Sequence, residues 1–426
     1  MTRAKARGVS GIASVTAAMA VASLAGMVLL LMIGRLLSPA DFGLFVAFWG
    51  VLFGLGSSLS TIEQETARRA AAAVDEDGPT AGAVTAAAAL IASAVAALTL
   101  IPPVSERLYG DASSVIGLVV VAATIGFSVQ FAVRGLLMGT GSIRDYAGIV
   151  VAEALSRLVL VGVVALAFDL TLPTAAVAVA AGSYAWLLWA RRAGSVIPRT
   201  RPNARQLWPA LRRAGSLMLG AALTASMVTG FPTMVTILTG SPSTATGAVF
   251  AALTVSRVPL LVVSPLQAMA VPTVLRWNAA KADGRGSPLR RMLALGTGAF
   301  VVLSAAGGIV GWYLGPQIVR LVYGSAYEVG PGAVALLVAS ACILAWVLLL
   351  SAALVALAAY RRMITMWLVA VTLTVVWLVA SPLGTVESTA VGALVGPCGA
   401  IAYALPTLWS MTRRKVEAPA AIPMAN

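Results

Sequence analysis

Residues 10–33 read SGIASVTAAMAVASLAGMVLLLMI, a stretch of 24 residues without a charge. A membrane-spanning helix needs about 20 consecutive, mostly apolar residues, and comparable stretches recur along the whole chain between short charged segments. Of the 426 residues, 60% are hydrophobic and only 10% are charged, whereas soluble domains carry about 25% charged residues. The composition therefore excludes a soluble globular protein and predicts an all-α polytopic membrane protein.

The apolar stretches predict about 12 transmembrane helices. The predicted spans are 10–34, 42–62, 83–102, 114–139, 146–168, 172–190, 214–238, 247–273, 292–314, 331–357, 363–381 and 388–411. If both termini are cytoplasmic, 23 of the 29 Lys and Arg residues fall in inner segments and three in outer segments. Because basic residues concentrate on the cytoplasmic side, this distribution predicts a multi-pass plasma-membrane protein with both termini inside.

Two short motifs recur about half a chain apart. SPADFG at 38–43 follows the first span, and Ser241-Pro242, with Gly247 beyond it, follows the seventh. RLYG at 107–110 follows the third span, and RLVYG at 320–324 follows the ninth. The repeats predict two homologous six-helix lobes, a design that transporters commonly use. The expected domains are an N-terminal lobe at 1–190, a cytoplasmic Arg-rich linker at 191–213, a C-terminal lobe at 214–411 and a cytoplasmic tail at 412–426.

The sequence lacks the groups that most enzymes and cofactor-binding proteins need. It has no His, and its two cysteines, Cys342 and Cys398, lie in apolar stretches, so no Cys/His metal site is expected. The predicted outer loops are short, and no paired carboxylates or nucleophile–base sets stand out. We therefore expect no enzyme, no catalytic residue and no cofactor. The net charge of +14 follows the topology rule, and no nucleic-acid partner is expected.

A few ionisable residues interrupt the predicted spans. Each costs at least about 2.5–3.5 kcal/mol at the bilayer centre, so such residues face a cavity or a partner. Glu153 and Arg157 are four residues apart on the fifth span, which places them on one helical face. Two interpretations stay open: a structural ion pair, or a site that protonation of Glu153 switches during transport.

Two further arginines lie near the ends of predicted helices. Arg134 is close to the end of the fourth span, where its side chain could either snorkel to the interface or face a cavity. Arg35 ends the first span and could either meet an anionic ligand at the outer mouth of a cavity or anchor the helix at the interface.

Arg257 lies near the middle of the eighth predicted span, with no acidic residue within four positions. Pro259, Pro265 and Pro272 follow it, and prolines loosen a transmembrane helix where neighbours or water satisfy the freed carbonyls. A deep cation beside possible kinks is typical of an anion-binding, moving cavity wall, although a structural pairing with an acid such as Glu153 is the alternative.

Three motifs resemble those of polysaccharide-biosynthesis flippases, the O-antigen and capsule transporters. GRLLSPADFGLF at 34–45 resembles their first inter-helix segment, RGLLMGTG at 134–141 their fourth-helix ending, and SRVP at 256–259 followed by Pro265 their eighth helix. The resemblance covers roughly residues 10–410. It implies membership of the multidrug/oligosaccharidyl-lipid/polysaccharide (MOP) exporter superfamily, whose members have two six-helix lobes around a central cavity that opens alternately to each side.

The resemblance implies a flippase that moves a polyprenyl-(pyro)phosphate-linked oligosaccharide to the outer leaflet for cell-surface polysaccharide synthesis. Arg257 would then be the main phosphate ligand, with secondary contacts from Arg134, Arg157 and Arg35. Expected partners are the lipid-linked glycan, membrane lipids and glycan-assembly enzymes. A MATE-like drug exporter and a lipid II-type flippase, both from the same superfamily, remain the alternatives. The chain lacks the two additional C-terminal helices and the first-helix arginines of the lipid II branch.

Overall fold

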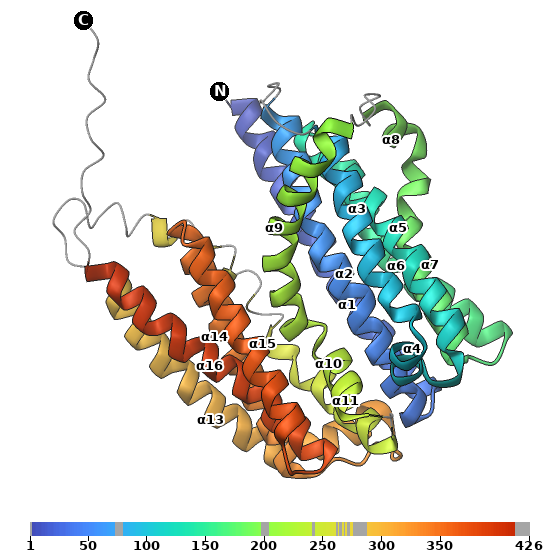
Figure 1. The fold of residues 1–426 in the computed structure, drawn as a ribbon, viewed down its shortest axis with the longest axis vertical. Helices are drawn as coiled ribbons and strands as arrows, with labels where there is room; N and C mark the ends of the chain where they lie inside the picture. The colour runs from blue at the N-terminus through green and yellow to red at the C-terminus, as the bar shows by residue number, and fades with distance from the viewer. Residues whose placement is uncertain are drawn as a thin grey trace, which may run out of the picture. The chain divides into compact units, whose positions relative to one another are not determined.

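The computed structural model describes residues 2–72, 80–196, 204–240, 243–260, scattered positions between 263 and 275, and 288–413. Every regular element in these ranges is a helix (Figure 1), which confirms the all-α prediction. The chain forms two compact units, and each is described by itself. Unit 1 comprises Met1–Ala252, Gln317–Val329 and Ser381–Thr389, and unit 2 comprises Leu253–Pro316, Gly330–Ala380 and Ala390–Asn426.

Unit 1 holds the helices of the first half of the chain and part of the second. Its elements are α1 (Thr2–Leu36), α2 (Pro39–Ala72), α3 (Ala81–Ala97), η1 (Leu98–Leu100), α4 (Pro102–Tyr109), η2 (Gly110–Ala112), α5 (Ser113–Gly139), α6 (Ile143–Ala167), α7 (Leu172–Ala181), η3 (Gly182–Trp189), α8 (Ala190–Val196), α9 (Ala204–Val228), α10 (Phe231–Thr239) and most of α11 (Thr244–Ser256). Within this unit α2 packs along α5, α1 packs along α6, and α9 contacts both α2 and α3.

Unit 2 is built mainly from four long helices of the second half. They are most of α13 (Pro288–Tyr323), α14 (Pro331–Ala356), α15 (Tyr360–Ala380) and most of α16 (Thr385–Arg413). The last turns of α13 and the first turn of α16 belong to unit 1. In the core of unit 2, the Trp367 indole donates a hydrogen bond to Ser351 Oγ over 3.1 Å.

Ten helices of the described residues are long and apolar enough to cross a membrane. The predicted seventh span is a bent pair, Gln206–Val228 and Phe231–Thr239, which meet at 74°. The predicted eighth span is represented by the shorter apolar helix Thr244–Leu260, and part of 247–273, including Pro265 and Pro272, lies outside the described residues. The chain is a multi-pass α-helical membrane protein, as the sequence predicts.

Several helices extend beyond their predicted limits. α2 continues to Ala72 and α13 to Tyr323, about ten residues past the ends that hydropathy alone suggests. The last ten residues of the predicted linker, 204–213, also belong to a long helix, because α9 begins at Ala204 and continues to Val228. A helix ends where its backbone groups find other partners, so its end need not coincide with the edge of the apolar stretch.

Capping and glycine explain where other helices begin and end. Ser38 Oγ accepts a hydrogen bond from the Asp41 backbone N–H at 3.1 Å, as an N-cap of α2. Thr171 and Thr174 form a reciprocal capping box at the start of α7. Gly110 and Gly324, the glycines of the second repeated motif, both take positive φ, at 59° and 110°. These turns therefore favour glycine in both copies.

Small residues allow α2 and α5 to approach closely. A Cβ added to Gly135 would overlap Thr66 Oγ1 and the Glu63 carbonyl, and one added to Gly139 would lie 2.6 Å from the Ala70 Cβ. Membrane helices associate through such small residues, because lipid supplies little hydrophobic drive for helix–helix contact. The close crossing brings the polar residues in the C-terminal half of α2 next to α5.

Candidate functional site

Five polar residues of unit 1 form a buried charge cluster, contributed by α2, α5 and α6. Its members are Glu63, Arg134, Tyr146, Glu153 and Arg157. Their exposed fractions lie between 2% and 9%. The cluster is the main concentration of buried charge in the described part of unit 1, so we examined it as the candidate site.

Arg134 lies between the two carboxylates of the buried charge cluster. Its Nε is 3.0 Å from Glu63 Oε2, and its Nη1 donates to Glu153 Oε2 over 3.2 Å. The Tyr146 hydroxyl donates to Glu63 Oε1 over 2.9 Å and accepts from Arg134 Nη2 over 3.3 Å. The tyrosine thus joins an acid and a base of the cluster and fixes the orientation of both side chains.

Glu153 also holds the second arginine. Arg157 Nη2 donates to Glu153 Oε1 over 2.6 Å, and its Nε donates to the Val179 carbonyl over 3.2 Å. Glu153 and Arg157 lie on one helical face, as their spacing predicts, and they form an ion pair. A Cβ at Gly182 would lie 2.6 Å from Arg157 Cγ, so the absence of a side chain at this position leaves room for the arginine.

Aromatic rings cover the arginines where carboxylates do not. The Arg157 guanidinium lies 4.8 Å from the centroid of the Phe53 ring, and that of Arg134 lies 5.0 Å from the Phe131 centroid. Such cation–π contacts favour a cation in a site with little water. Two carboxylates and two guanidiniums balance in charge, which a buried cluster requires because an unpaired buried charge is costly.

Glu63 is the charged member of the cluster that the sequence analysis missed. The second span was predicted to end at residue 62, which places Glu63 in a loop. α2 instead continues to Ala72, and the Glu63 side chain is buried against α5 and α6. The signal available in the sequence was the pair Glu63 and Glu65 directly after an apolar stretch, followed by Arg68 and Arg69 at helical spacing.

Glu65, two residues after Glu63 on α2, anchors a second group of charges. Its carboxylate lies 2.7 Å from Arg69 Nε, 3.2 Å from Arg68 Nε and 2.9 Å from Arg213 Nη2. Arg213 is contributed by α9, so this group ties the Arg-rich segment to the end of α2. Glu63, Glu65 and Glu153 are the buried acidic side chains of the described residues, and each of them is paired with arginine.

Arg35 lies apart from the buried charge cluster, at the end of α1. Its guanidinium donates to the backbone carbonyls of Leu321 and Val322, in the last turns of α13 that belong to unit 1. Nearby, the Tyr327 hydroxyl donates to the Gly34 carbonyl over 2.6 Å. Burial raises the pKa of Tyr327, which keeps this hydroxyl protonated as a donor. Arg35 therefore holds two chain segments together in this structure.

Arg257 belongs to unit 2, in the residues that follow α11. Its backbone N–H donates to the Thr254 carbonyl over 3.3 Å and its carbonyl accepts from the Leu260 N–H over 2.9 Å, so it continues a helical turn. Of the five predicted site residues, the structure brings Arg134, Glu153 and Arg157 together. Arg35 and Arg257 each lie elsewhere, and the role of all five stays a prediction.

Comparison with known proteins gives relatives along nearly the whole chain. No protein-family model matches. The uncharacterized protein Rv1510 of Mycobacterium tuberculosis (strain ATCC 25618 / H37Rv) is 30% identical over 411 residues, covering 93% of this chain and 91% of that protein. The uncharacterized protein Rv3630 of the same strain is 29% identical over 412 residues, with the same coverage.

Solved structures share the fold. An inward-facing multidrug resistance MATE family transporter of the MOP superfamily matches with a TM-score of 0.67 and 16% identity, over 92% of this chain and 94% of that one. The lipid II flippase MurJ in an inward closed conformation matches with a TM-score of 0.67 and 10% identity, over 93% and 87%. The fold is therefore that of MATE transporters and MurJ, and the 30% identity across 93% of the chain shows that it belongs to the same protein family as Rv1510 of Mycobacterium tuberculosis.

Proposed function

We propose that this protein is a flippase that moves a polyprenyl-(pyro)phosphate-linked oligosaccharide from the cytoplasmic to the outer leaflet of the plasma membrane. The proposal includes alternating access as the mechanism and cytoplasmic termini. It is supported by the fold shared with exporters and with a lipid II flippase, and by the resemblance of the sequence motifs to polysaccharide flippases. Glycan-assembly enzymes are the protein partners that this function would require.

One observation favours an anionic substrate over a cationic one. Each buried carboxylate of the described residues, Glu63, Glu65 and Glu153, is already neutralised by arginine. A cationic drug would have to displace a guanidinium to reach such a carboxylate, which costs desolvation on both sides. A phosphate headgroup instead needs a cationic partner, and arginine binds phosphate through paired hydrogen bonds.

In this proposal the arginines have different tasks. Arg257 is the main phosphate ligand, as the sequence motif implies. Arg134 and Arg157 are held by Glu63 and Glu153, so they reach a phosphate only when a carboxylate releases them. Arg35, bound to backbone carbonyls, is a secondary contact that becomes available when α1 separates from the last turns of α13.

Flipping in proteoliposomes tests the proposal. The probe is a short-chain isoprenyl pyrophosphate that carries a fluorescent disaccharide, and dithionite added outside bleaches only the outer leaflet. We expect about half of the signal to be bleached in empty liposomes and nearly all of it in liposomes that contain the protein. Arg257→Gln should abolish this gain while the protein still inserts, with Arg320→Gln as the control. Equal bleaching with and without the wild-type protein would refute the flippase function.

A MATE-like exporter of small cations is the second candidate, because several MATE transporters share the fold. Such an exporter would use a buried acid for coupling, and Glu153 holds the central position in the buried charge cluster. This candidate predicts that expression raises resistance to lipophilic cations and that Glu153→Gln removes the resistance. A lipid II-type flippase is the third candidate. Transport of lipid II in preference to the polyprenyl-(pyro)phosphate-linked oligosaccharide would identify it.

A further inference from the structure

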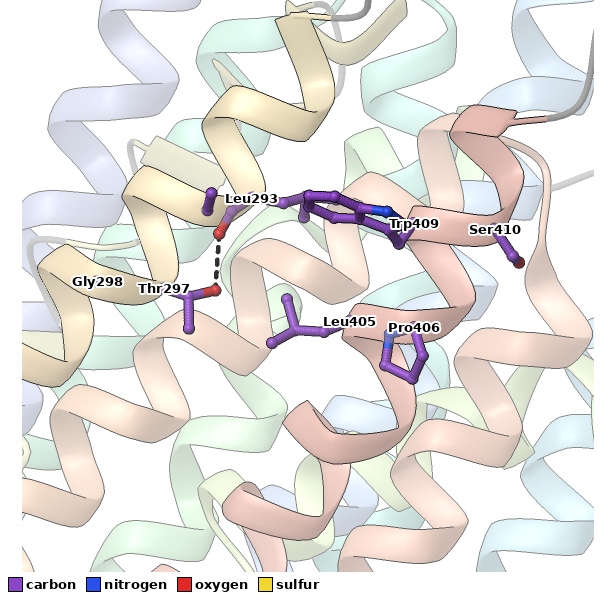
Figure 2. Close-up of a pocket in the computed structure, with 8 residues that line it drawn as sticks. Leu293, Thr297, Gly298, Leu405, Pro406, Trp409 and Ser410 are labelled. Carbon is purple, nitrogen blue, oxygen red and sulfur yellow. Dashed lines mark hydrogen bonds between the residues drawn. The ribbon is translucent and has the colours of Figure 1, made fainter.

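A groove lies between two helices of unit 2, far along the chain from the buried charge cluster. Its volume is about 610 Å³. Figure 2 shows Trp409 reaching from α16 toward Leu293 of α13, with Leu405 and Pro406 beside them. The lining consists of Leu293, Ala294, Thr297 and Gly298 from α13 and Leu405, Pro406, Trp409 and Ser410 from α16. We call this the α13–α16 groove.

The sequence explains why the helices leave a groove here. The lining residues of each helix have the same spacing, i, i+1, i+4 and i+5, so each set forms one helical face. On α13 that face carries Ala294 and Gly298, which fill little volume. On α16 it carries Pro406, which removes a backbone hydrogen bond within the helix. The lining is mostly apolar, and the Thr297 hydroxyl donates to the Leu293 carbonyl of its own helix over 2.7 Å.

A cation lies at one end of the groove. Arg290 is three residues before Leu293 and four before Ala294 on α13, so it shares their helical face. Its guanidinium carbon is 5.6 Å from the centroid of the Trp409 ring, and Trp409 lines the groove. The α13–α16 groove thus combines an apolar lining with a positive charge at its end. It is complementary to an amphiphile with one hydrocarbon chain and an anionic head.

The groove is accessible from a bilayer. Ala294, Gly298, Pro406 and Trp409 are exposed in the structure, and α13 leaves most of its apolar surface uncovered. Among the described residues, the lining comes from two helices, which suits a single chain better than the two acyl chains of a glycerolipid. Positive-inside topology puts Arg290 on the cytoplasmic side, the side from which a flippase takes its substrate.

We infer that the α13–α16 groove binds the hydrocarbon chain of an isoprenoid phosphate, with the phosphate at Arg290. The inference rests on the proposed function, because it gives the lipid part of the proposed substrate a place on the protein. The groove holds the chain while the headgroup is translocated, and Arg290 orients the phosphate at the start of the cycle.

Binding to the purified full-length protein tests the inference, measured by native mass spectrometry in detergent. The probes are farnesyl phosphate, farnesol, inorganic pyrophosphate and dioleoylphosphatidylglycerol. Farnesyl phosphate should bind most tightly. Arg290→Gln should weaken the binding of farnesyl phosphate about tenfold or more, because hydrogen bonds to charged groups contribute more than neutral ones. The same variant should leave farnesol binding unchanged. Arg291→Gln is the matched control, because Arg291 is exposed on another face of the same turn.

A second variant fills the groove without disturbing the backbone. A Cβ at Gly298 would meet no atom within 4 Å, so Gly298→Leu adds volume to the groove alone. Gly298→Leu should weaken the binding of both farnesyl phosphate and farnesol about tenfold or more, which corresponds to about 1.4 kcal/mol. Gly162→Leu on α6 is the control, because a Cβ there also meets no atom within 4 Å. Unchanged farnesyl phosphate binding by Gly298→Leu overturns the inference, and so does equally tight binding of phosphatidylglycerol.

The outcomes separate this inference from the proposed function. If the wild-type protein flips the pyrophosphate probe and Gly298→Leu binds farnesyl phosphate normally, the groove site is wrong and the flippase function stands. If farnesyl phosphate binding depends on Gly298 and Arg290 but the wild-type protein flips no glycan lipid, the groove site stands and the flippase function is wrong.

Discussion

The buried charge cluster and the α13–α16 groove accommodate polar groups in opposite ways. In the cluster, Arg134 and Arg157 face carboxylates of the same chain at 2.6–3.2 Å, and every charge is balanced internally. In the groove, apolar side chains line an open space of about 610 Å³, with Arg290 at its end. The cluster is complete without a ligand, whereas the groove offers surface that a ligand can cover. The difference predicts that mutations in the cluster affect stability more than mutations in the groove.

The largest effect is expected from removing the central cation of the cluster. Arg134→Met leaves the Glu63 carboxylate buried without its arginine, and breaking such a pair costs about 3–5 kcal/mol. Thermal denaturation of the detergent-solubilised protein should show a large drop in Tm. The double variant Arg134→Met/Glu63→Gln should recover much of it, because Glu153 retains Arg157. A Tm equal to that of the wild type would mean that the cluster is not structural.

A smaller effect is expected from one methyl group placed in each region. Gly135→Ala forces a Cβ against Thr66 and the Glu63 backbone, and overpacking of this kind costs about 1–3 kcal/mol. Gly298→Ala adds the same methyl group where no atom lies within 4 Å, so its Tm should equal or exceed that of the wild type, because alanine favours a helix more than glycine does. Equal Tm values for the two variants would show that the close approach of α2 and α5 is dispensable.

The smallest effect is expected from a polar group of the groove. Thr297→Val keeps the shape and removes a hydroxyl whose hydrogen bond within the described residues goes to the carbonyl of Leu293 in the same helix. The free energy of unfolding should change by less than about 0.5 kcal/mol, and farnesol binding should remain unchanged. A loss comparable to that of Gly135→Ala would contradict the view that the groove contributes little to stability.

The sequence reveals what depends on local pattern. The apolar stretches predict the spanning helices, because about 20 apolar residues suffice to identify each one. The spacing of Glu153 and Arg157 places them on one helical face, and in the structure they are 2.6 Å apart. The repeated motifs mark two turns at which Gly110 and Gly324 both take positive φ. Each of these features depends on a continuous segment of about 20 residues or fewer.

The tertiary structure decides what depends on distant partners. The hydropathy pattern predicted that the second span ends before Glu63. The packing of α2 on α5 reveals that this acid pairs with Arg134, 71 residues further along the chain. The same packing buries Arg134, which is 9% exposed and paired with two carboxylates. The α13–α16 groove joins Arg290 to Trp409 across more than a hundred residues. Such contacts follow from how helices pack against one another, which the periodicity of a single helix does not specify.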